Sequence, residues 1–233
     1  MRAALLAMLV ATLFSTPLST SIVLVATAAA AQPGSAANGA LFEHPVTAGQ
    51  LLQTTLAGPA AELSKAKVLS GKFVQRRFLK GLERPLASSG DFVLAREQGI
   101  IWRTATPFPS EFVLSDKGMS LLDGDTETRL SAASHPGLQA ALKMFFALIT
   151  LDMERLTGSF DLYGDNQGDR WQVGLRPRDG GLAQVFDRAV ISGAQTVERI
   201  ELSTAGGDRT EIEFSGVATR AELDASDAAR FRE

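Results

Sequence analysis

Apolar and polar positions alternate along most of the stretch from Phe73 to Leu122. Each alternating run is only a few residues long and ends at a polar turn. Short runs with a period of two, separated by glycine and proline, are typical of strands in an antiparallel meander. The pattern therefore predicts consecutive strands over residues 68–130. The turns between them contain Gly81, Pro85, Gly90, Gly99, Pro107, Pro109 and Gly118.

Several of these runs carry apolar residues on both faces. Phe92 and Leu94 share one face of their strand, and Val93 lies on the other. Trp102 and Ile101 repeat this arrangement in the next run. A sheet that is apolar on both sides has to be covered on both sides, or to be hollow on one. We therefore expect a cover or a cavity against this half of the sheet.

Alternation resumes after Gly158, but in these later runs only one face is apolar. Ile212 and Phe214, for example, alternate with glutamates. One apolar face is typical of an antiparallel sheet with its other side in water. Residues 206–208 predict a hairpin turn between the last two strands, and residues 182–191 fit either a helix or a strand.

Three stretches have helical rather than strand spacing. Thr47 and Gln50 have the spacing of a capping box at the start of a helix that ends near Leu56. A second helical piece, over 60–67, leads into the first strand. The third, over 134–149, fits either an ordinary core helix or an apolar lid over a cavity in the sheet. Its apolar face consists of Leu138, Leu142, Phe145, Phe146 and Ile149.

The N-terminus has the features of an export signal. Arg2 precedes an apolar run, a Ser/Thr-rich break follows, and a second apolar run ends in four alanines, of which Ala31 is the last. Small residues there permit cleavage, most simply after Ala31. An uncleaved membrane anchor is the alternative, although neither half of the run reaches the roughly 20 apolar residues of a spanning helix. We expect a signal peptide over 1–31, a flexible spacer over 32–45, one domain over 46–233 and a periplasmic location.

The composition agrees with a single globular domain. The chain has 233 residues, of which 45% are hydrophobic, and a formal net charge of −3. A small negative charge argues against nucleic-acid binding, which leaves a basic footprint. The chain contains no cysteine, so neither disulfides nor thiolate metal ligands contribute to the fold.

No motif for catalysis stands out in the sequence. The two histidines, His44 and His135, have no neighbour at metal-ligand spacing. Residues 123–127 alternate acidic and small side chains but lack the glycine and terminal glutamate of an EF-hand loop, which favours a solvated turn. Asp161 and Asp165 could pair as acid and base, but an acidic chain offers such pairs by chance. We expect no enzymatic activity, no metal and no cofactor.

Two apolar surfaces remain to be explained in a chain that carries an export signal. One is the half of the sheet that is apolar on both faces, and the other is the predicted helix over 134–149. Exported proteins that carry lipid need such surfaces, because each buried methylene contributes about 0.8 kcal/mol. A hollow apolar sheet can therefore hold acyl chains without any catalytic residue.

An ordered series of short motifs resembles the LolA-type outer-membrane lipoprotein carriers. The similarity is strongest over Phe73–Leu122 and weaker over 208–231, where residues 227–231 resemble the closing segment of the family. The strand end at 115–118 is one residue longer here than in the family. The series comprises Phe73-x-Gln75, Ser89-Gly90-Asp91-Phe92, Arg96, Ile100-Ile101-Trp102, Pro107 and Val113-Leu114-Ser115-Asp116.

The resemblance implies a mainly β fold with helices, in which an unclosed antiparallel β-barrel is covered by a helical lid. Members of the family collect acylated lipoproteins from an inner-membrane ABC transporter, cross the periplasm and pass them to an outer-membrane receptor. By position, Arg96 corresponds to the strand arginine that hydrogen-bonds the closed lid, which makes it the predicted latch. The predicted lipid-binding wall consists of Phe92, Leu94, Ile100, Trp102, Phe112, Leu114, Leu138, Leu142, Phe145 and Phe146.

Two departures indicate a divergent, LolA-related branch. The chain ends shortly after Phe231, where the family usually continues with a proline-containing extension. The pieces at 83–86 and 175–179 resemble a branch that accompanies lipid or pigment export systems. We therefore expect a non-enzymatic, monomeric carrier of acylated lipoproteins or of another lipid cargo, with an inner-membrane exporter as donor and an outer-membrane acceptor. Two alternatives stay open: a lipid-acting accessory hydrolase, and a non-catalytic β-sheet assembly factor of the cell envelope.

Overall fold

The structure, a computed structural model, describes most of the chain after the predicted signal peptide. The segments predicted as signal peptide and as the start of the spacer lie outside the described residues. Most of the predicted helix over 134–149 also lies outside them. The described residues are 38–59, 63, 65–96, 98–131, 146–178, 180–183 and 186–232.

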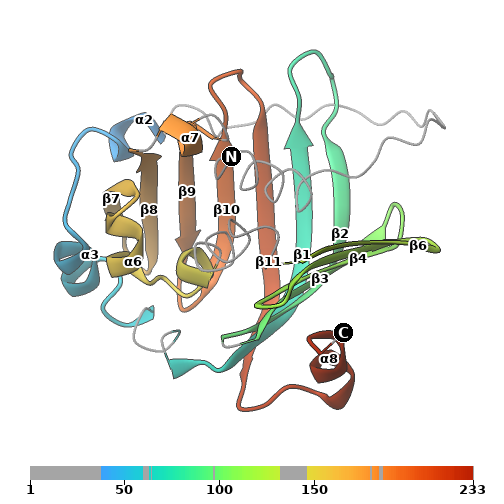
Figure 1. Cartoon of the computed structure of the whole chain (residues 1–233). Coiled ribbons are helices and arrows are strands. Elements are labelled where there is room, and N and C mark those ends of the chain that lie inside the picture. The colour runs from blue at the N-terminus through green and yellow to red at the C-terminus, as the bar shows by residue number, and fades with distance from the viewer. Residues whose placement is uncertain are drawn as a thin grey trace.

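The described strands form one antiparallel sheet of 11 strands (Figure 1). Their order is β6-β5-β4-β3-β2-β1-β11-β10-β9-β8-β7, so the sheet consists of two meanders that meet where β1 pairs with β11. The first meander contains β1 (Val68–Phe78), β2 (Leu86–Ala95), β3 (Gly99–Thr106), β4 (Ser110–Ser115), β5 (Gly118–Asp123) and β6 (Thr126–Ser131). The second contains β7 (Phe160–Gln167), β8 (Arg170–Pro177), β9 (Arg188–Gly193), β10 (Val197–Ser203) and β11 (Arg209–Arg220).

The sheet curls strongly but does not close into a barrel. Its order ends at β6 on one side and at β7 on the other. Figure 1 shows β3 to β6 turned across the upright strands β8 to β11. The expectation of an unclosed antiparallel barrel with helices is confirmed. Residues 182–191 fit either a helix or a strand from the sequence alone. In the structure they include the end of the short helix α7 (Gly180–Ala183) and the start of β9.

The two faces of the sheet carry separate apolar clusters. The inner face, which contains Phe92 and Ile100, belongs to one large cluster that also includes helical residues. The outer face of the first meander contains Val93 and Ile101, in a second and smaller cluster. The two-sided pattern of the first meander therefore corresponds to two buried faces, as period-two alternation requires.

Helices cover the inner face of the second meander. Helix α3 (Ala48–Thr54) begins at Thr47, whose side chain and backbone form the predicted capping box with Gln50. Helix α6 (Met153–Thr157) begins at Asp152, whose carboxylate accepts a hydrogen bond from the Arg155 amide. Residues 146–149 are also helical.

The N-terminal end of the described chain packs on the outer face of the second meander. Helix α2 (Asn38–Leu41) precedes Phe42, whose ring lies 5.0 Å from that of Tyr163. The Val46 amide donates to the carbonyl of Leu162 on β7. Part of the segment predicted as a flexible spacer is therefore packed against the sheet.

Helix α8 (Ala225–Arg230) covers the outer face of the first meander (Figure 1). Asp227, which is 5% exposed, accepts a hydrogen bond from Arg103 at 2.7 Å. Arg103 also pairs with Glu111 at 2.8 Å, and Glu111 in turn pairs with Arg230 at 2.6 Å. Phe231 completes the cover, because its ring is buried in the outer apolar cluster.

Between α2 and α8 the outer face is polar. Glu211 on β11 lies 2.9 Å from both Arg199 and Arg209. Arg76 on β1 pairs with Glu213 at 3.0 Å. These pairs alternate with the apolar residues of the inner face, as the one-sided pattern of the second meander predicts.

Candidate functional site

Four aromatic rings form the centre of the inner face. Phe73 of β1 and Trp102 of β3 stack with ring centroids 3.9 Å apart. Phe92 of β2 meets Phe214 of β11 edge to face at 5.2 Å. The rings come from both meanders, because β1 and β11 are neighbours in the sheet. Such aromatic pairs add about 0.5–1.5 kcal/mol beyond the area they bury.

Gly90 permits the closest of these contacts. It lies opposite Phe73 on β2, and its lack of a side chain lets Phe73 and Trp102 stack across that strand. A Cβ atom at Gly90 would also come within 1.8 Å of the Arg103 carbonyl oxygen. The glycine of the Ser-Gly-Asp-Phe motif is therefore required by both backbone and ring packing.

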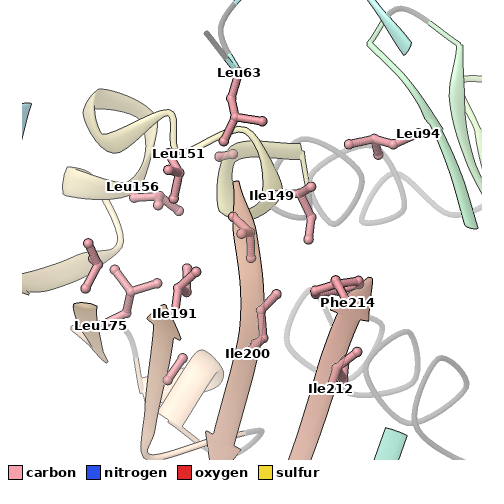
Figure 2. Close-up of a cluster of buried hydrophobic side chains, with 14 of the residues drawn as sticks. Leu63, Leu94, Ile149, Leu151, Leu156, Leu175, Ile191, Ile200, Ile212 and Phe214 are labelled. Carbon is pink, nitrogen blue, oxygen red and sulfur yellow. The ribbon is translucent and has the colours of Figure 1, made fainter. Parts of the chain in front are cut away.

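Helical residues close over the strands on this face. Figure 2 shows Leu151, Leu156 and Ile149 facing the strand residues Ile191 and Ile200. All five side chains are at most 6% exposed. The cover and the wall are therefore in apolar contact, with water excluded between them.

A small apolar gap remains between the cover and the sheet. Its volume of about 10 Å³ is close to the minimum that holds one water molecule. Pockets that hold drug-sized ligands measure about 300–1,000 Å³. This gap is therefore too small for an acyl chain, which could enter it only if the residues around it moved apart. The residues around the gap are Leu63, Leu69, Phe92, Ile149, Val197, Phe214 and Val217.

Arg96 holds the segment at residues 63–67, which lies before β1 and forms one side of the cover over the inner face. Its Nε donates to the Ala66 carbonyl at 3.2 Å, and its Nη2 donates to the Leu63 carbonyl at 3.1 Å. Its backbone amide also donates to the Lys67 carbonyl at 2.9 Å. Leu63 is 2% exposed and borders the gap. Arg96 therefore forms hydrogen bonds with the backbone of this segment, and the side chain of Leu63 covers part of the apolar face.

The structure brings six predicted wall residues together on the inner face. All six are buried in the large apolar cluster, and Phe146 packs against that cluster with partial exposure. Leu138, Leu142 and Phe145 lie outside the described residues. The described partners of Arg96 lie in the helical piece before β1, and most of the lid over 134–149, where we expected them, lies outside the described residues. The six buried residues are Phe92, Leu94, Ile100, Trp102, Phe112 and Leu114.

The sequence did not identify the part of the wall that β1, β10 and β11 contribute. Phe73 and Phe214 are central to it, and Leu69 and Val197 border the gap. The alternation around Phe73 was readable, but the pairing of β1 with β11 joins residues far apart in the sequence. No local pattern shows which distant strands become neighbours.

A larger hollow lies on the outer face, between α8 and strands β4 to β6. Its volume is about 210 Å³, and its rim includes Lys117, Arg129 and Arg230. Each of these cations has a partner: Lys117 bonds the Arg232 carbonyl, Arg129 pairs with Glu127, and Arg230 pairs with Glu111. The hollow therefore has a charged rim whose cations are compensated, whereas the residues around the gap are all apolar. Its other lining residues are Val113, Ser115, Gly118, Met119, Ser120, Leu130 and Ser131.

Asp161 and Asp165, which were considered as an acid and base pair, lie on the opposite face of β7 from the inner residues Phe160 and Leu162. Asp161 pairs with Arg178 at 2.6 Å, with more than a third of its side chain exposed. His135 lies outside the described residues. Among the residues that the structure describes, no cluster of His, Cys, Asp or Glu is arranged to hold a metal. In the same part of the chain, no helix has the length and apolar character needed to span a membrane.

Residues 64–228 match the family described as "Outer membrane lipoprotein carrier protein LolA". The chain belongs to the LolA family. The match covers both meanders, the Arg96 segment and most of α8. It confirms the resemblance that the motifs of the first meander indicate.

Solved structures with low sequence identity are similar to this chain. A LolA superfamily protein from Nitrosomonas europaea has 10% identity and a TM-score of 0.39, over 78% of this chain and 96% of its own. The lipoprotein LppX from Mycobacterium tuberculosis has 9% identity and a TM-score of 0.40, over 75% and 99%. The MucA/MucB complex of Pseudomonas aeruginosa has 15% identity and a TM-score of 0.43, over 74% of this chain and 58% of the matched chain. The search of curated proteins finds no match.

Proposed function

We propose that this LolA-family protein is a periplasmic, non-enzymatic carrier of lipid-modified cargo. It shields the acyl chains of a lipoprotein, or of another acylated molecule, between the inner face and its helical cover. It receives this cargo from an inner-membrane exporter and delivers it to an outer-membrane acceptor. The observation that carries the proposal is the aromatic inner face, over which separate apolar segments pack, one of them held by hydrogen bonds from Arg96.

The position of the gap supports this role. Leu63 and Ile149 border the gap from two different cover segments, and the sheet residues opposite them are apolar. Separation of these segments would expose the wall of Phe92 and Phe214 without unfolding the sheet. Acyl chains would then replace the cover side chains, with about 0.8 kcal/mol for each methylene buried.

The first experiment measures uptake directly. Titration of the purified protein with a fluorescent acyl probe should give saturable binding, and lipid should co-extract with protein isolated from the periplasm. Ile100→Glu should weaken uptake strongly, because it places an unpaired charge on a wall position that is fully buried. A wild-type protein that neither binds the probe nor carries lipid would refute the carrier function.

Arg96→Leu tests the latch. Hydrogen bonds from a charged donor contribute roughly 1.5–3 kcal/mol, and here they stabilise the closed, empty state. Their loss should favour the cargo-bound state by about tenfold or more and slow cargo release accordingly. Arg96→Lys, which keeps the charge and one donor, is the matched control and should lie between wild type and Arg96→Leu. Unchanged release from Arg96→Leu would exclude the latch.

The small volume of the gap favours a second candidate function. A closed, well-packed inner face also suits a non-catalytic assembly factor that binds a partner strand at an open sheet edge. Such a factor needs no cargo, so its inner-face variants would alter stability but not lipid content. Mass spectrometry of the lipid extract from wild type and Ile100→Glu distinguishes the two functions.

A further inference from the structure

The inner face of β1 changes character along the strand. Leu69 and Phe73 are buried in the apolar cluster, and the next residues on the same face are Gln75 and Arg77. Register places Gln75 opposite Ile212 of β11 and Arg77 opposite Thr210. The apolar wall therefore ends in two polar side chains just beyond the aromatic centre.

Both side chains contain a buried polar atom without a hydrogen-bond partner. Gln75 is 4% exposed, and its Oε1 atom accepts no hydrogen bond. The Nε–H of Arg77 is buried and donates none. Buried polar groups are almost always paired, so each unpaired one calls for an explanation. Here the two atoms offer complementary chemistry, one acceptor and one donor, on the same face of one strand.

The surroundings of Arg77 favour an anion beside it. Burial lowers the pKa of the Arg77 guanidinium, while the charge of Asp208 acts in the opposite direction. The Asp208 carboxylate already accepts a hydrogen bond from the Lys80 amide at 2.8 Å. An incoming anionic oxygen would replace the water that Arg77 has lost and satisfy its Nε–H.

The spacing suits an amphiphile. Leu69 borders the apolar gap, and Gln75 lies six positions further along β1, which corresponds to about 20 Å in an extended strand. The acyl region of one bilayer leaflet is about 15 Å deep, half of a core of about 30 Å. An acyl chain of ordinary length could therefore lie along the wall with its polar end beside Gln75 and Arg77.

We propose that Gln75 and Arg77 form a head-group subsite for an acidic acyl ligand. Arg77 binds an anionic oxygen of a carboxylate or phosphate, and Gln75 Oε1 accepts a hydrogen bond from a hydroxyl or amide of the same head group. The subsite rests on the proposed carrier function, because the wall must first admit an acyl chain. Among acylated cargo, it gives a preference for amphiphiles with an acid group near the chain.

The test compares three probes, each with a chain of sixteen carbons, on the full-length mature protein. Hexadecanoic acid, hexadecyl phosphate and methyl hexadecanoate each displace a bound fluorescent acyl probe. The two acids should bind at least tenfold more tightly than the ester, and the stronger of the two identifies the head group as carboxylate or phosphate. Inorganic phosphate alone should not displace the probe, because it lacks the chain.

Variants on the two faces of β1 provide the controls. Arg77→Gln should abolish the preference for acids while retaining ester binding, and Gln75→Leu should weaken it. Arg76→Gln should leave the preference intact, because Arg76 pairs with Glu213 on the outer face. Gln75→Leu should not lower the melting temperature, because it removes an unpaired buried polar atom.

The outcomes separate the subsite from the carrier function. Equal binding of acids and ester by wild type would overturn the subsite and leave the carrier intact. Absence of binding for all three probes would refute the carrier itself. A preference that survives in Arg77→Gln but disappears in Arg76→Gln would also overturn the assignment. The comparison on wild type alone decides the question if a variant does not fold.

Discussion

The two faces of the first meander bury apolar side chains under covers of different kinds. On the outer face, α8 is attached by the connected ion pairs of Arg103, Asp227 and Glu111. On the inner face, Arg96 bonds two backbone carbonyls of the cover segment at 63–67, those of Leu63 and Ala66. One cover is fastened by ion pairs between side chains, and the other by an arginine that donates hydrogen bonds to neutral carbonyls.

The difference follows from the electrostatics of each cover. Burial alone lowers the pKa of Arg103, but hydrogen bonds with Asp227 and Glu111, and their charges, raise it overall. Removal of α8 would therefore separate Asp227 from Arg103 and Arg230 from Glu111 at once. Carbonyl acceptors are neutral, so separation from Arg96 breaks hydrogen bonds to a charged donor but none of these ion pairs. As far as polar contacts are concerned, the inner cover is the one that opens at lower cost.

The largest expected effect comes from a matched pair on β3. Ile100 on the inner face and Ile101 on the outer face are both fully buried. Truncation of either to alanine should lower the free energy of unfolding by about 2–5 kcal/mol. Only Ile100→Ala should change acyl-probe uptake, because only its cavity joins the wall. Denaturant titrations combined with probe binding check both expectations, and equal uptake by the two variants would contradict the division between the faces.

The next effect concerns the ion pairs that fasten α8. Arg103→Met leaves Asp227 buried without its strongest partner and should lower the free energy of unfolding by about 2–3 kcal/mol. Amide exchange in residues 225–230 should accelerate, while acyl uptake stays unchanged. Arg76→Met is the control: it breaks an exposed pair with Glu213 and should cost at most about 1 kcal/mol. Similar losses in the free energy of unfolding for Arg103→Met and Arg76→Met would mean that the ion pairs of Arg103 stabilise the fold no more than an exposed pair does.

The smallest effect compares the starts of two cover helices. Thr47 caps α3 with a side-chain hydrogen bond, so Thr47→Ala should cost about 1 kcal/mol. Asp224, at the start of α8, makes no capping bond and instead pairs with Arg220 at 2.6 Å. Asp224→Ala should therefore cost less than Thr47→Ala in thermal unfolding. A larger loss of stability in Asp224→Ala than in Thr47→Ala would show that Asp224, rather than the ion pairs of Asp227 and Arg230, stabilises α8.

The local pattern of the chain was sufficient for the first meander. Alternation at Phe92 and Leu94 predicts their shared face, and the opposite position of Val93 predicts the second cluster. The capping box at Thr47 likewise predicts the start of α3. These features depend on neighbours within a few residues, and for that reason they can be read directly.

The site depended on contacts between distant segments. The family resemblance indicates Arg96 as a latch, and the carbonyls that it bonds in the structure are those of Leu63 and Ala66, in the segment before β1. Only the way in which β2 meets the segment before β1 decides which carbonyls lie within reach of the guanidinium. The unpaired atoms of Gln75 and Arg77 could not be predicted either, because pairing depends on everything that packs around them.

The sequence by itself determined the strands, their apolar faces and the membership of the LolA family, because these depend on spacing and local motifs. The tertiary structure decided that Phe73 and Phe214 share one wall, that two covers are fastened differently, and that the gap beside Phe214 is too small for an acyl chain. The physical reason is that burial and pairing arise from the whole arrangement. A residue acquires them only when strands such as β1 and β11, distant in the chain, become neighbours.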